Sequence, residues 1–300
     1  MAVFQSKGEP LSGFSNMWRW VALVALVIAT SQAQAAIDND LVVGYAIEGA
    51  PGAEQKADLG PGARNIFAFR NGNENVIAND NAASQSYSSL VYRPEGTNGT
   101  DNEAGANING SLSQSFAEQT FVAWIRRDSS DTGTNLTSTH RNVFAIQDGN
   151  LVNTTGDQIW WLEDTNRRFR WNFYHSGGSS EGIGADVSIP LDEWTHVATV
   201  YDNGVSSVLI NGVPVTTVAA GTPNPGTAIP AASGGELSIG YAFNVASSLL
   251  GQIDEVALFS RALQPWEVQS IMNVGIEAFP EPASGMMLIF AGAGLLRRRR

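Results

Sequence analysis

The sequence predicts an all-β fold in which two antiparallel sheets pack as a sandwich, with one short helix near the carboxyl end. Short segments rich in β-branched and aromatic residues recur about every ten residues from Gln119 onward, with turn residues between them. Residues 168–174 alternate strictly between apolar and polar side chains, the period of a half-buried strand. Asn-Gly at 211–212 separates two β-rich segments and is typical of a hairpin turn.

The individual elements follow from the same patterns. Before Gln119 the composition is rich in Asn, Gly, Ala and Ser, which favours irregular strands and long surface loops. Pro265 at a first helical turn predicts a helix over 265–272. The predicted strands are 41–45, 65–69, 89–92, 119–125, 142–146, 157–162, 168–174, 194–201, 205–210, 213–215, 237–240 and 251–259.

The amino end, residues 1–35, predicts a secretory signal peptide. A polar, positively charged start precedes the apolar run 20–29, and Ala33 and Ala35 then stand at the two positions that a signal peptidase reads. The alternative is an uncleaved membrane anchor, but the apolar run is shorter than the roughly 20 residues of a membrane span. We therefore expect an exported protein that is cleaved after Ala35.

The carboxyl end, 276–300, has the composition of a second processing signal. A helix over its apolar stretch, 283–296, would rise about 21 Å, which is short of the ~30 Å hydrocarbon core. The terminal arginines would stay on the cytoplasmic side of a membrane. The residues that define the signal are Pro280, Glu281 and Pro282, followed after the apolar stretch by Arg297, Arg298, Arg299 and Arg300.

These three parts, in this order, resemble the PEP-CTERM sorting signal of Gram-negative bacteria. The resemblance implies that an exosortase recognises the Pro-Glu-Pro motif and removes the helix after a transient contact with the inner membrane. It also implies delivery to the cell surface or the extracellular matrix. An ordinary tail anchor is the alternative interpretation.

Charge and cysteine content exclude several classes of function. The formal net charge is −12, and the folded part is more acidic still because six basic residues lie in the two terminal segments. This argues against a nucleic-acid partner, since phosphate binding depends on Lys and Arg. The chain has no cysteine, which excludes disulfides, thiolate zinc sites and cysteine nucleophiles.

Three groups of segments stand out in the stretch 119–272. They are Thr-Phe-Val-Ala-Trp-Ile at 120–125; Trp-Thr-His-Val-Ala-Thr-Val-Tyr-Asp at 194–202 with Val-Leu-Ile-Asn-Gly-Val at 208–213; and Leu-Ser-Ile-Gly at 237–240 with Gly-Gln-Ile-Asp-Glu-Val-Ala-Leu-Phe at 251–259 and Ser-Arg-Ala-Leu at 260–263. In this order they resemble LamG-like, concanavalin A-like lectin/glucanase domains. The resemblance implies a two-sheet antiparallel jelly-roll sandwich over 36–275, with one concave sheet. Many members of the family bind glycans or proteins, and others are structural.

Catalytic motifs are missing from the sequence. Some glycoside hydrolases with this sandwich carry Glu-x-Asp-x-x-Glu on one strand, and this motif does not occur here. We interpret the closest acidic pairs as solvated pairs or strand-end turns, since a strand directs adjacent side chains to opposite faces. They are Glu163–Asp164, Asp192–Glu193 and Asp254–Glu255. His140, His175 and His196 have no partners at metal-ligand spacing, and His196 lies in a segment whose resemblance makes it structural.

A group of aromatic and polar residues is the candidate carbohydrate-binding site. If Phe169, Trp171 and Phe173 fill the core, the alternate residues of that strand face outward, where aromatic rings can stack on sugars and Arg and Asn can bind hydroxyls. Trp160 and Trp161 are neighbours in a predicted strand, so one of them must also face outward. The candidates are Trp160, Trp161, Arg170, Asn172 and Tyr174. The alternative is that all the aromatic residues serve packing.

The family resemblance also implies a structural calcium ion bound through Asp254. This residue lies in Gly-Gln-Ile-Asp-Glu-Val at 251–256, the context in which related jelly rolls bind calcium near the sandwich edge. Calcium takes six to eight oxygen ligands, which backbone carbonyls can help to supply. The alternative is that Asp254 accepts hydrogen bonds from backbone N–H groups without a metal.

The leading functional hypothesis is an exported, non-catalytic surface or matrix protein that binds polysaccharide. Its expected processing partners are signal peptidase and an exosortase. A structural or protein-adhesion module without a glycan site is the alternative from another class, and a degenerate hydrolase is a third.

Overall fold

The computed structural model describes part of the chain, and its contacts divide the chain into two units, Asp40–Phe279 and Met1–Asn39 with Pro280–Arg300. The signal peptide and the sorting motif expected from the sequence lie outside the described residues. No helix in the described part is long and apolar enough to cross a membrane. The described residues are 40–45, 59, 66–70, 77–78, 89–92, 105–129, 140–148, 154–163, 165–175, 180–221, 228–240, 249 and 251–276, of which only the backbone is described at 66–70, 77–78, 89–92, 105–110 and 220–221.

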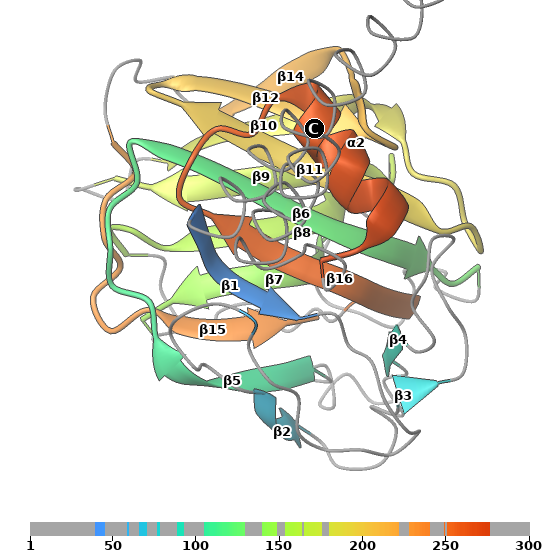
Figure 1. The fold of residues 1–300 in the computed structure, drawn as a ribbon, viewed down its shortest axis with the longest axis horizontal. Coiled ribbons are helices and arrows are strands. Elements are labelled where there is room, and N and C mark those ends of the chain that lie inside the picture. The colour runs from blue at the N-terminus through green and yellow to red at the C-terminus, as the bar shows by residue number, and fades with distance from the viewer. Residues whose placement is uncertain are drawn as a thin grey trace, which may run out of the picture. The chain divides into compact units, whose positions relative to one another are not determined.

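Two antiparallel sheets form the domain (Figure 1). Sheet A contains, in spatial order, β13 (Val213–Pro214), β12 (Val205–Ile210), β11 (Thr195–Asp202), β6 (Glu118–Arg127), β16 (Gly251–Phe259), β4 (Ser89–Tyr92) and β3 (Ile77–Ala78), with β1 (Leu41–Tyr45) also paired to β16. Sheet B contains β14 (Thr217–Gly221), β10 (Ser180–Ser188), β9 (Arg168–Tyr174), β8 (Gln158–Glu163), β7 (His140–Gln147), β15 (Glu236–Ile239), β5 (Gly105–Ser111) and β2 (Ile66–Arg70). The predicted all-β sandwich is confirmed.

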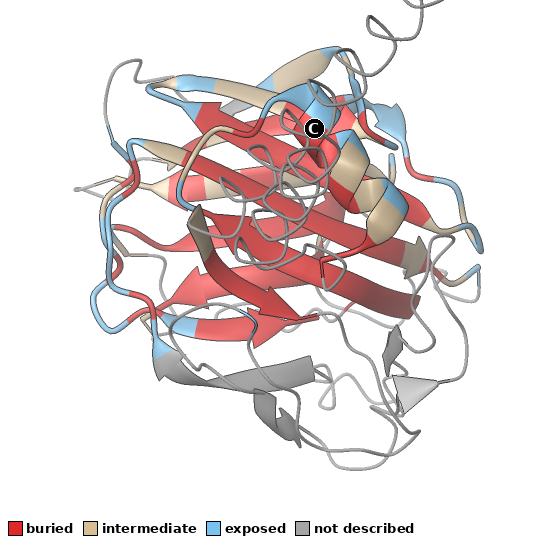
Figure 2. Ribbon diagram, viewed as in Figure 1, coloured by how far each residue is buried: buried red, intermediate tan, exposed pale blue. Residues whose placement is uncertain are grey.

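The core lies between the sheets, where buried residues concentrate in the central strands (Figure 2). Trp160 of sheet B is packed between Phe121 of sheet A, at 4.8 Å between ring centroids, and Trp171, at 5.7 Å. The indole Nε1 of Trp160 donates a hydrogen bond of 2.9 Å to Oγ1 of Thr199 on β11. This side-chain hydrogen bond joins the two sheets across the apolar core.

An Asn-Gly turn forms a hairpin of sheet A. Asn211 and Gly212 have φ of 51° and 72°, and they connect β12 to β13 with Ile210 paired to Val213. Positive φ at both central residues matches the right-handed twist of paired strands, and Asn and Gly tolerate it best. The hairpin predicted from this dipeptide is confirmed. A Cβ at Gly212 would also lie 2.6 Å from Cγ of Gln269, so this turn packs closely against the helix.

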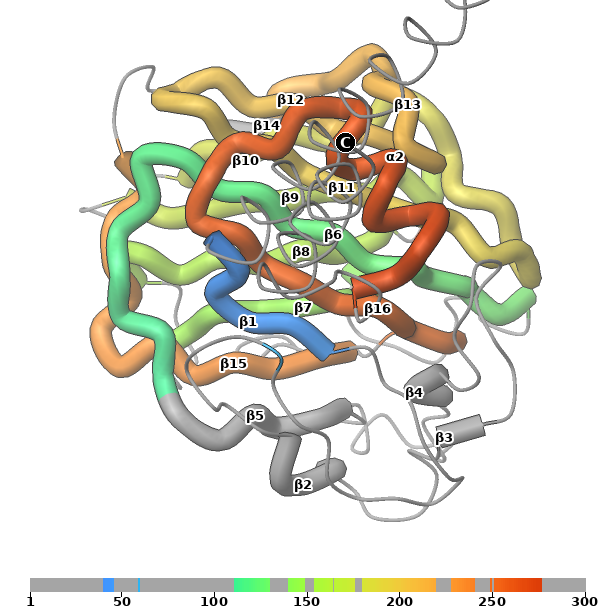
Figure 3. Tube along the Cα trace, viewed as in Figure 1, coloured from blue at the N-terminus to red at the C-terminus, as the bar shows by residue number. Residues whose placement is uncertain are grey.

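The helix α2 (Pro265–Val274) begins at the predicted proline and is two residues longer than predicted. Its start is held by Glu267, which accepts the N–H of Gln264 at 2.8 Å and two hydrogen bonds from Arg261, at 2.9 and 2.7 Å. The same guanidinium contacts Asp40 at 2.8 Å. Asp40 directly precedes β1, and Arg261 follows β16. These first and last strands of the domain pair with each other, and Figure 3 shows β1 beside β16.

The outer face of sheet A, over which α2 lies, contains a buried histidine. Asp254, Trp124 and His196 occupy paired positions on β16, β6 and β11, and all three are buried. The His196 ring packs edge-on against Trp124 at 5.3 Å, and neither ring nitrogen has a hydrogen-bond partner among the described residues. Burial lowers the pKa of His196 to about 3.

His196 should make the domain less stable as the pH falls below about 6.5. The folded-state pKa is lower than the ordinary value, so the unfolded chain binds a proton in this range that the folded chain does not. At pH 5 the expected loss is about 2 kcal/mol of unfolding free energy relative to neutral pH. The measurement is chemical denaturation of the wild type and His196→Leu at pH 5 and 7.5.

The variant should lose less stability than the wild type between these two pH values, because leucine does not titrate. Other groups that titrate in this range are the same in both proteins and cancel in the comparison. Equal losses in both proteins would show that His196 is not held neutral by burial.

Candidate functional site

The outer face of sheet B is formed by alternate residues of its central strands. Along β9, Phe169, Trp171 and Phe173 are buried in the core between the sheets, and the intervening residues are only partly buried. Arg170 and Asn172 therefore point away from sheet A, as the alternation predicts.

The two adjacent tryptophans of β8 point to opposite sides of sheet B. Trp160 is fully buried in the core, where it forms the aromatic stack and the hydrogen bond to Thr199. Trp161 belongs to a second apolar cluster with Ala145 and Ile159, against which Tyr174 packs. Of the two candidates, only Trp161 lies on the side of the outward residues of β9, where it is itself buried, and Trp160 lies in the core between the sheets.

Strand pairing sets the outward side chains in rows. One row runs from Trp161 on β8 through Arg170 on β9 to Gly184 on β10, and the next from Ile159 through Asn172 to Gly182. A Cβ at Gly184 would lie 2.7 Å from Cδ of Arg170, and a Cβ at Gly182 would overlap the side-chain amide of Asn172. The two glycines therefore leave room for the β9 side chains over β10.

Glu163 and His140 complete this surface. Arg170 Nε donates a 2.8 Å hydrogen bond to Oε1 of Glu163, and the His140 ring lies edge-on to Trp161 at 5.0 Å. Burial lowers the pKa of His140, with further lowering by Arg141 and Arg170, while Glu163 opposes the shift. We call the set the outer-face cluster: His140, Trp161, Glu163, Arg170, Asn172 and Tyr174.

Tyr174 is positioned by the loop that leads into β8. Its N–H donates to the carbonyl of Asp157 at 3.0 Å, and its carbonyl accepts the N–H of Gly156 at 2.8 Å. The Asp157 carboxylate is buried and accepts the N–H groups of Asp148, at 3.2 Å, and Thr154, at 2.9 Å. Burial, with a contribution from the Asp148 charge, raises the pKa of Asp157 to about 6, although these hydrogen bonds oppose the shift.

Three buried polar atoms of the outer-face cluster make no hydrogen bond with the described residues. They are the indole Nε1 of Trp161, Oδ1 of Asn172 and Oε2 of Glu163. One is a donor and two are acceptors. A buried polar atom without a partner is costly, so these atoms mark a place where one donor and two acceptors remain unsatisfied by the described residues.

Sequence reasoning missed Glu163 and His140 as members of this surface. Glu163 was interpreted as part of a solvated acidic pair or a strand-end turn, and it does end β8 at a turn, but its carboxylate is also paired with Arg170. The signal was present in the alternation, because Glu163 is two residues after Trp161 and must share its face. For His140 the signal was its pairing with Glu163, which requires the register of β7 against β8.

Family comparison agrees with this architecture. Residues 98–269 match the family described as the concanavalin A-like lectin/glucanases superfamily. The chain belongs to this superfamily. No curated protein matches the sequence.

Two solved structures similar to this superfamily member are a mutant of HCR/D and the binding domain of botulinum neurotoxin serotype G. A mutant of HCR/D is 10% identical, with a TM-score of 0.53 and coverage of 79% of this chain and 53% of the other. The binding domain of botulinum neurotoxin serotype G is 13% identical, with a TM-score of 0.51 and coverage of 78% and 50%. The chain thus spans about half of these two structures. At this identity the similarity supports the fold alone.

A third similar structure is domain 4 of AbnA, an extracellular GH43 arabinanase from Geobacillus stearothermophilus, in complex with arabinotriose. It is 16% identical, with a TM-score of 0.48 and coverage of 78% of this chain and 98% of the other.

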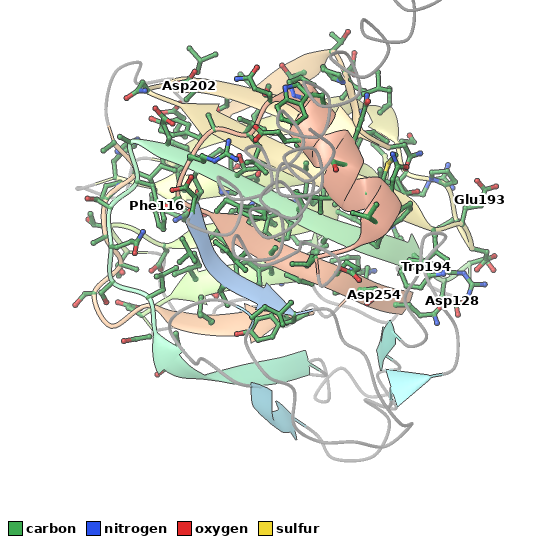
Figure 4. All side chains as sticks on the ribbon, in the orientation of Figure 1. Phe116, Asp128, Glu193, Trp194, Asp202 and Asp254 are labelled. Carbon is green, nitrogen blue, oxygen red and sulfur yellow. The ribbon has the colours of Figure 1, made fainter. Side chains whose placement is uncertain are left out.

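Asp254, the expected calcium ligand, lies in the middle of β16 and is labelled in Figure 4. Asp254 and Glu255 are both buried at a register shift in β16, and Glu255 has a φ of 50°. The interpretation of this pair as solvated is therefore wrong. Glu255 Oε2 accepts the N–H of Ile276 at 2.6 Å, and Asp254 Oδ1 accepts the N–H of Glu255 at 2.9 Å.

A carboxylate oxygen at Asp254 has the right chemistry for calcium, but it supplies only part of a ligand set. No group of three or more His, Asp or Glu residues that could hold a metal occurs among the described residues. The remaining ligands would be backbone carbonyls or residues outside the described ranges. The calcium ion thus stays a prediction.

Calcium should raise the melting temperature of the wild-type domain relative to chelator, and Asp254→Ala should abolish the difference. At a calcium concentration of about 100 times the dissociation constant, the gain is about 2.7 kcal/mol. Glu255→Gln is the matched control, because it changes the neighbouring carboxylate and should leave the calcium effect intact. The same wild-type melting temperature in both buffers would leave Asp254 as a hydrogen-bonding residue only.

Proposed function

We propose that this chain is an exported, non-catalytic protein of the cell surface or extracellular matrix that binds polysaccharide through the outer-face cluster. The superfamily membership supports a lectin-like domain. What supports this particular site is the set of unpartnered polar atoms on Trp161, Asn172 and Glu163, beside the rings of Trp161 and Tyr174.

This combination matches the surface of a sugar. A pyranose or furanose ring has apolar C–H faces that pack on aromatic side chains, and hydroxyls around its rim that each donate and accept a hydrogen bond. Trp161 Nε1 can donate to a hydroxyl oxygen, and Asn172 Oδ1 can accept from the same or a neighbouring hydroxyl. The ligand would thereby satisfy atoms that the described residues leave without partners.

A role in binding fits this cluster better than a role in catalysis. Glycoside hydrolysis uses two carboxyl groups across the scissile bond. The outer-face cluster holds one carboxylate, Glu163, and Arg170 occupies one of its oxygens. Asp157 lies beyond the Tyr174 end of the cluster, where its carboxylate is engaged by the backbone of its own loop.

The proposed destination rests on the two ends of the sequence. The Ala33–Ala35 motif supports cleavage by signal peptidase, and Pro280–Pro282 with the final arginines supports sorting by an exosortase. Between these steps the apolar stretch at 283–296 would keep the protein transiently at the inner membrane.

Trp161→Ala should weaken polysaccharide binding at least tenfold, about 1.4 kcal/mol, because it removes both the ring and the N–H donor. Trp161→Phe keeps a ring and loses only the donor, so its affinity should fall between those of the wild type and Trp161→Ala. The measurement is a glycan array followed by titration calorimetry on the best polysaccharide.

Trp266→Ala is the matched control for these variants, since Trp266 is an exposed tryptophan on α2, which lies over the other sheet. It should bind as the wild type does. Melting curves would confirm that each variant is folded. No binding by the wild type to any glycan would favour the structural or adhesion alternative, and equal loss in all three variants would move the site elsewhere.

The mature protein should end before the apolar stretch when it is made in cells that contain an exosortase. In cells without the exosortase, the tail should remain and the protein should stay with the membrane fraction. Intact-mass spectrometry distinguishes the two forms. A mature protein that still ends in Arg300 in the presence of the enzyme would exclude the sorting proposal.

A further inference from the structure

We propose that the outer-face cluster selects neutral polysaccharides and excludes acidic ones. This inference rests on the proposed binding function and names the chemical class of its ligand. Three observations carry it: the pairing of the cationic side chains, the kind of polar atom left without a partner, and the charge of the whole chain.

The cation at the centre of the cluster is already neutralised within sheet B. Arg170 contacts Oε1 of Glu163 through Nε at 2.8 Å and through a terminal nitrogen. The exposed fractions are 14% for the Arg170 side chain and 25% for that of Glu163, so the pair is largely shielded from water. A partly buried, charge-assisted pair of this kind is strong, and breaking it would leave a buried charge uncompensated.

The charges of β9 and β10 beside this pair also cancel. Arg168, two residues before Arg170, pairs with Asp186 of β10 at 2.7 Å. His140 is neutral near pH 7, because its pKa lies below the ordinary value of 6.5. The described outward side chains of β8, β9 and the adjoining part of β10 therefore present two cations and two anions, and each of these cations is paired with a carboxylate.

The atoms that lack partners favour hydroxyl groups over anions. Oδ1 of Asn172 and Oε2 of Glu163 are acceptors without a partner among the described residues, so a ligand group that reaches them must bring a donor. A sugar hydroxyl supplies that donor, whereas a carboxylate or sulfate supplies only acceptor oxygens. An anionic group at this position would face Glu163 at close range and would be repelled.

The chain as a whole strengthens this selection. Its formal net charge of −12 repels a polyanion before contact and lowers the rate of encounter. Neutral polysaccharides do not experience this barrier. Their binding should therefore depend little on salt, whereas any residual binding of acidic polysaccharides should depend on it strongly.

The test compares two panels of soluble polysaccharides with the full chain, in low and high salt. The neutral panel is a β-glucan, an arabinan and a mannan, and the acidic panel is alginate and polygalacturonate. At least one neutral polysaccharide should bind ten times more tightly than either acidic one in low salt, and raising the salt should leave this neutral binding unchanged.

Glu163→Gln probes the mechanism, because it keeps the shape of the side chain and frees the charge of Arg170. Acidic polysaccharides should then bind at least tenfold more tightly than to the wild type, and salt should reverse the gain. Asp186→Asn is the control, since it makes the same charge change at the more exposed Arg168–Asp186 pair and should produce less than a threefold gain.

The outcomes separate this inference from the proposed function. Wild-type binding that favours acidic polysaccharides, and that Trp161→Ala removes, would overturn the selection of neutral ligands while the binding function stands. No wild-type binding to either panel would overturn the binding function itself, and this inference with it. The wild-type comparison decides the matter even if Glu163→Gln fails to fold.

Discussion

The position of Trp160 between the sheets is the constraint on which the rest of the domain depends. Its ring stacks between Phe121 and Trp171, and its N–H is satisfied by Thr199 of the opposite sheet. Because neighbouring residues of a strand point to opposite faces, fixing Trp160 inward forces Trp161 outward. A slip of one residue in the pairing of β9 would turn Arg170 into the core without a partner. It would also turn the inward aromatic residues of β9 to the surface, at a cost of many kcal/mol in the free energy of folding.

The local alternation also explains which parts of the fold could be predicted. The strand at 168–174 carries large apolar residues at every second position, so its two faces were evident from the sequence. The turn at Asn211–Gly212 was equally clear, because few residues adopt positive φ at two successive positions. Both features depend on the preferences of neighbouring residues in the chain, which can be read from the residue types alone.

The features that were missed depend on the pairing between strands. The pairing of Glu163 with Arg170 was missed because the two residues are seven positions apart and meet only through the register of β8 against β9. The burial of Asp254 and Glu255 follows from a register shift in β16, which changes the alternation that sequence reasoning assumes. The alternation places Glu163 on the face of Trp161, but neither its pairing with Arg170 nor the register shift in β16 leaves a local signature in the residues themselves.

The outer-face cluster follows from a balance between these local and non-local constraints. The alternation directs Trp161, Arg170 and Asn172 to one face, but strand pairing decides that Arg170 meets Glu163 and that Asn172 lies over a glycine. Glu163 neutralises the charge of Arg170 within sheet B. Oδ1 of Asn172 and Oε2 of Glu163 have no partners among the described residues. A surface whose cations are already paired and whose spare atoms are mainly acceptors requires hydrogen-bond donors from its ligand, and hydroxyl groups are the uncharged groups that supply them most densely on a polysaccharide.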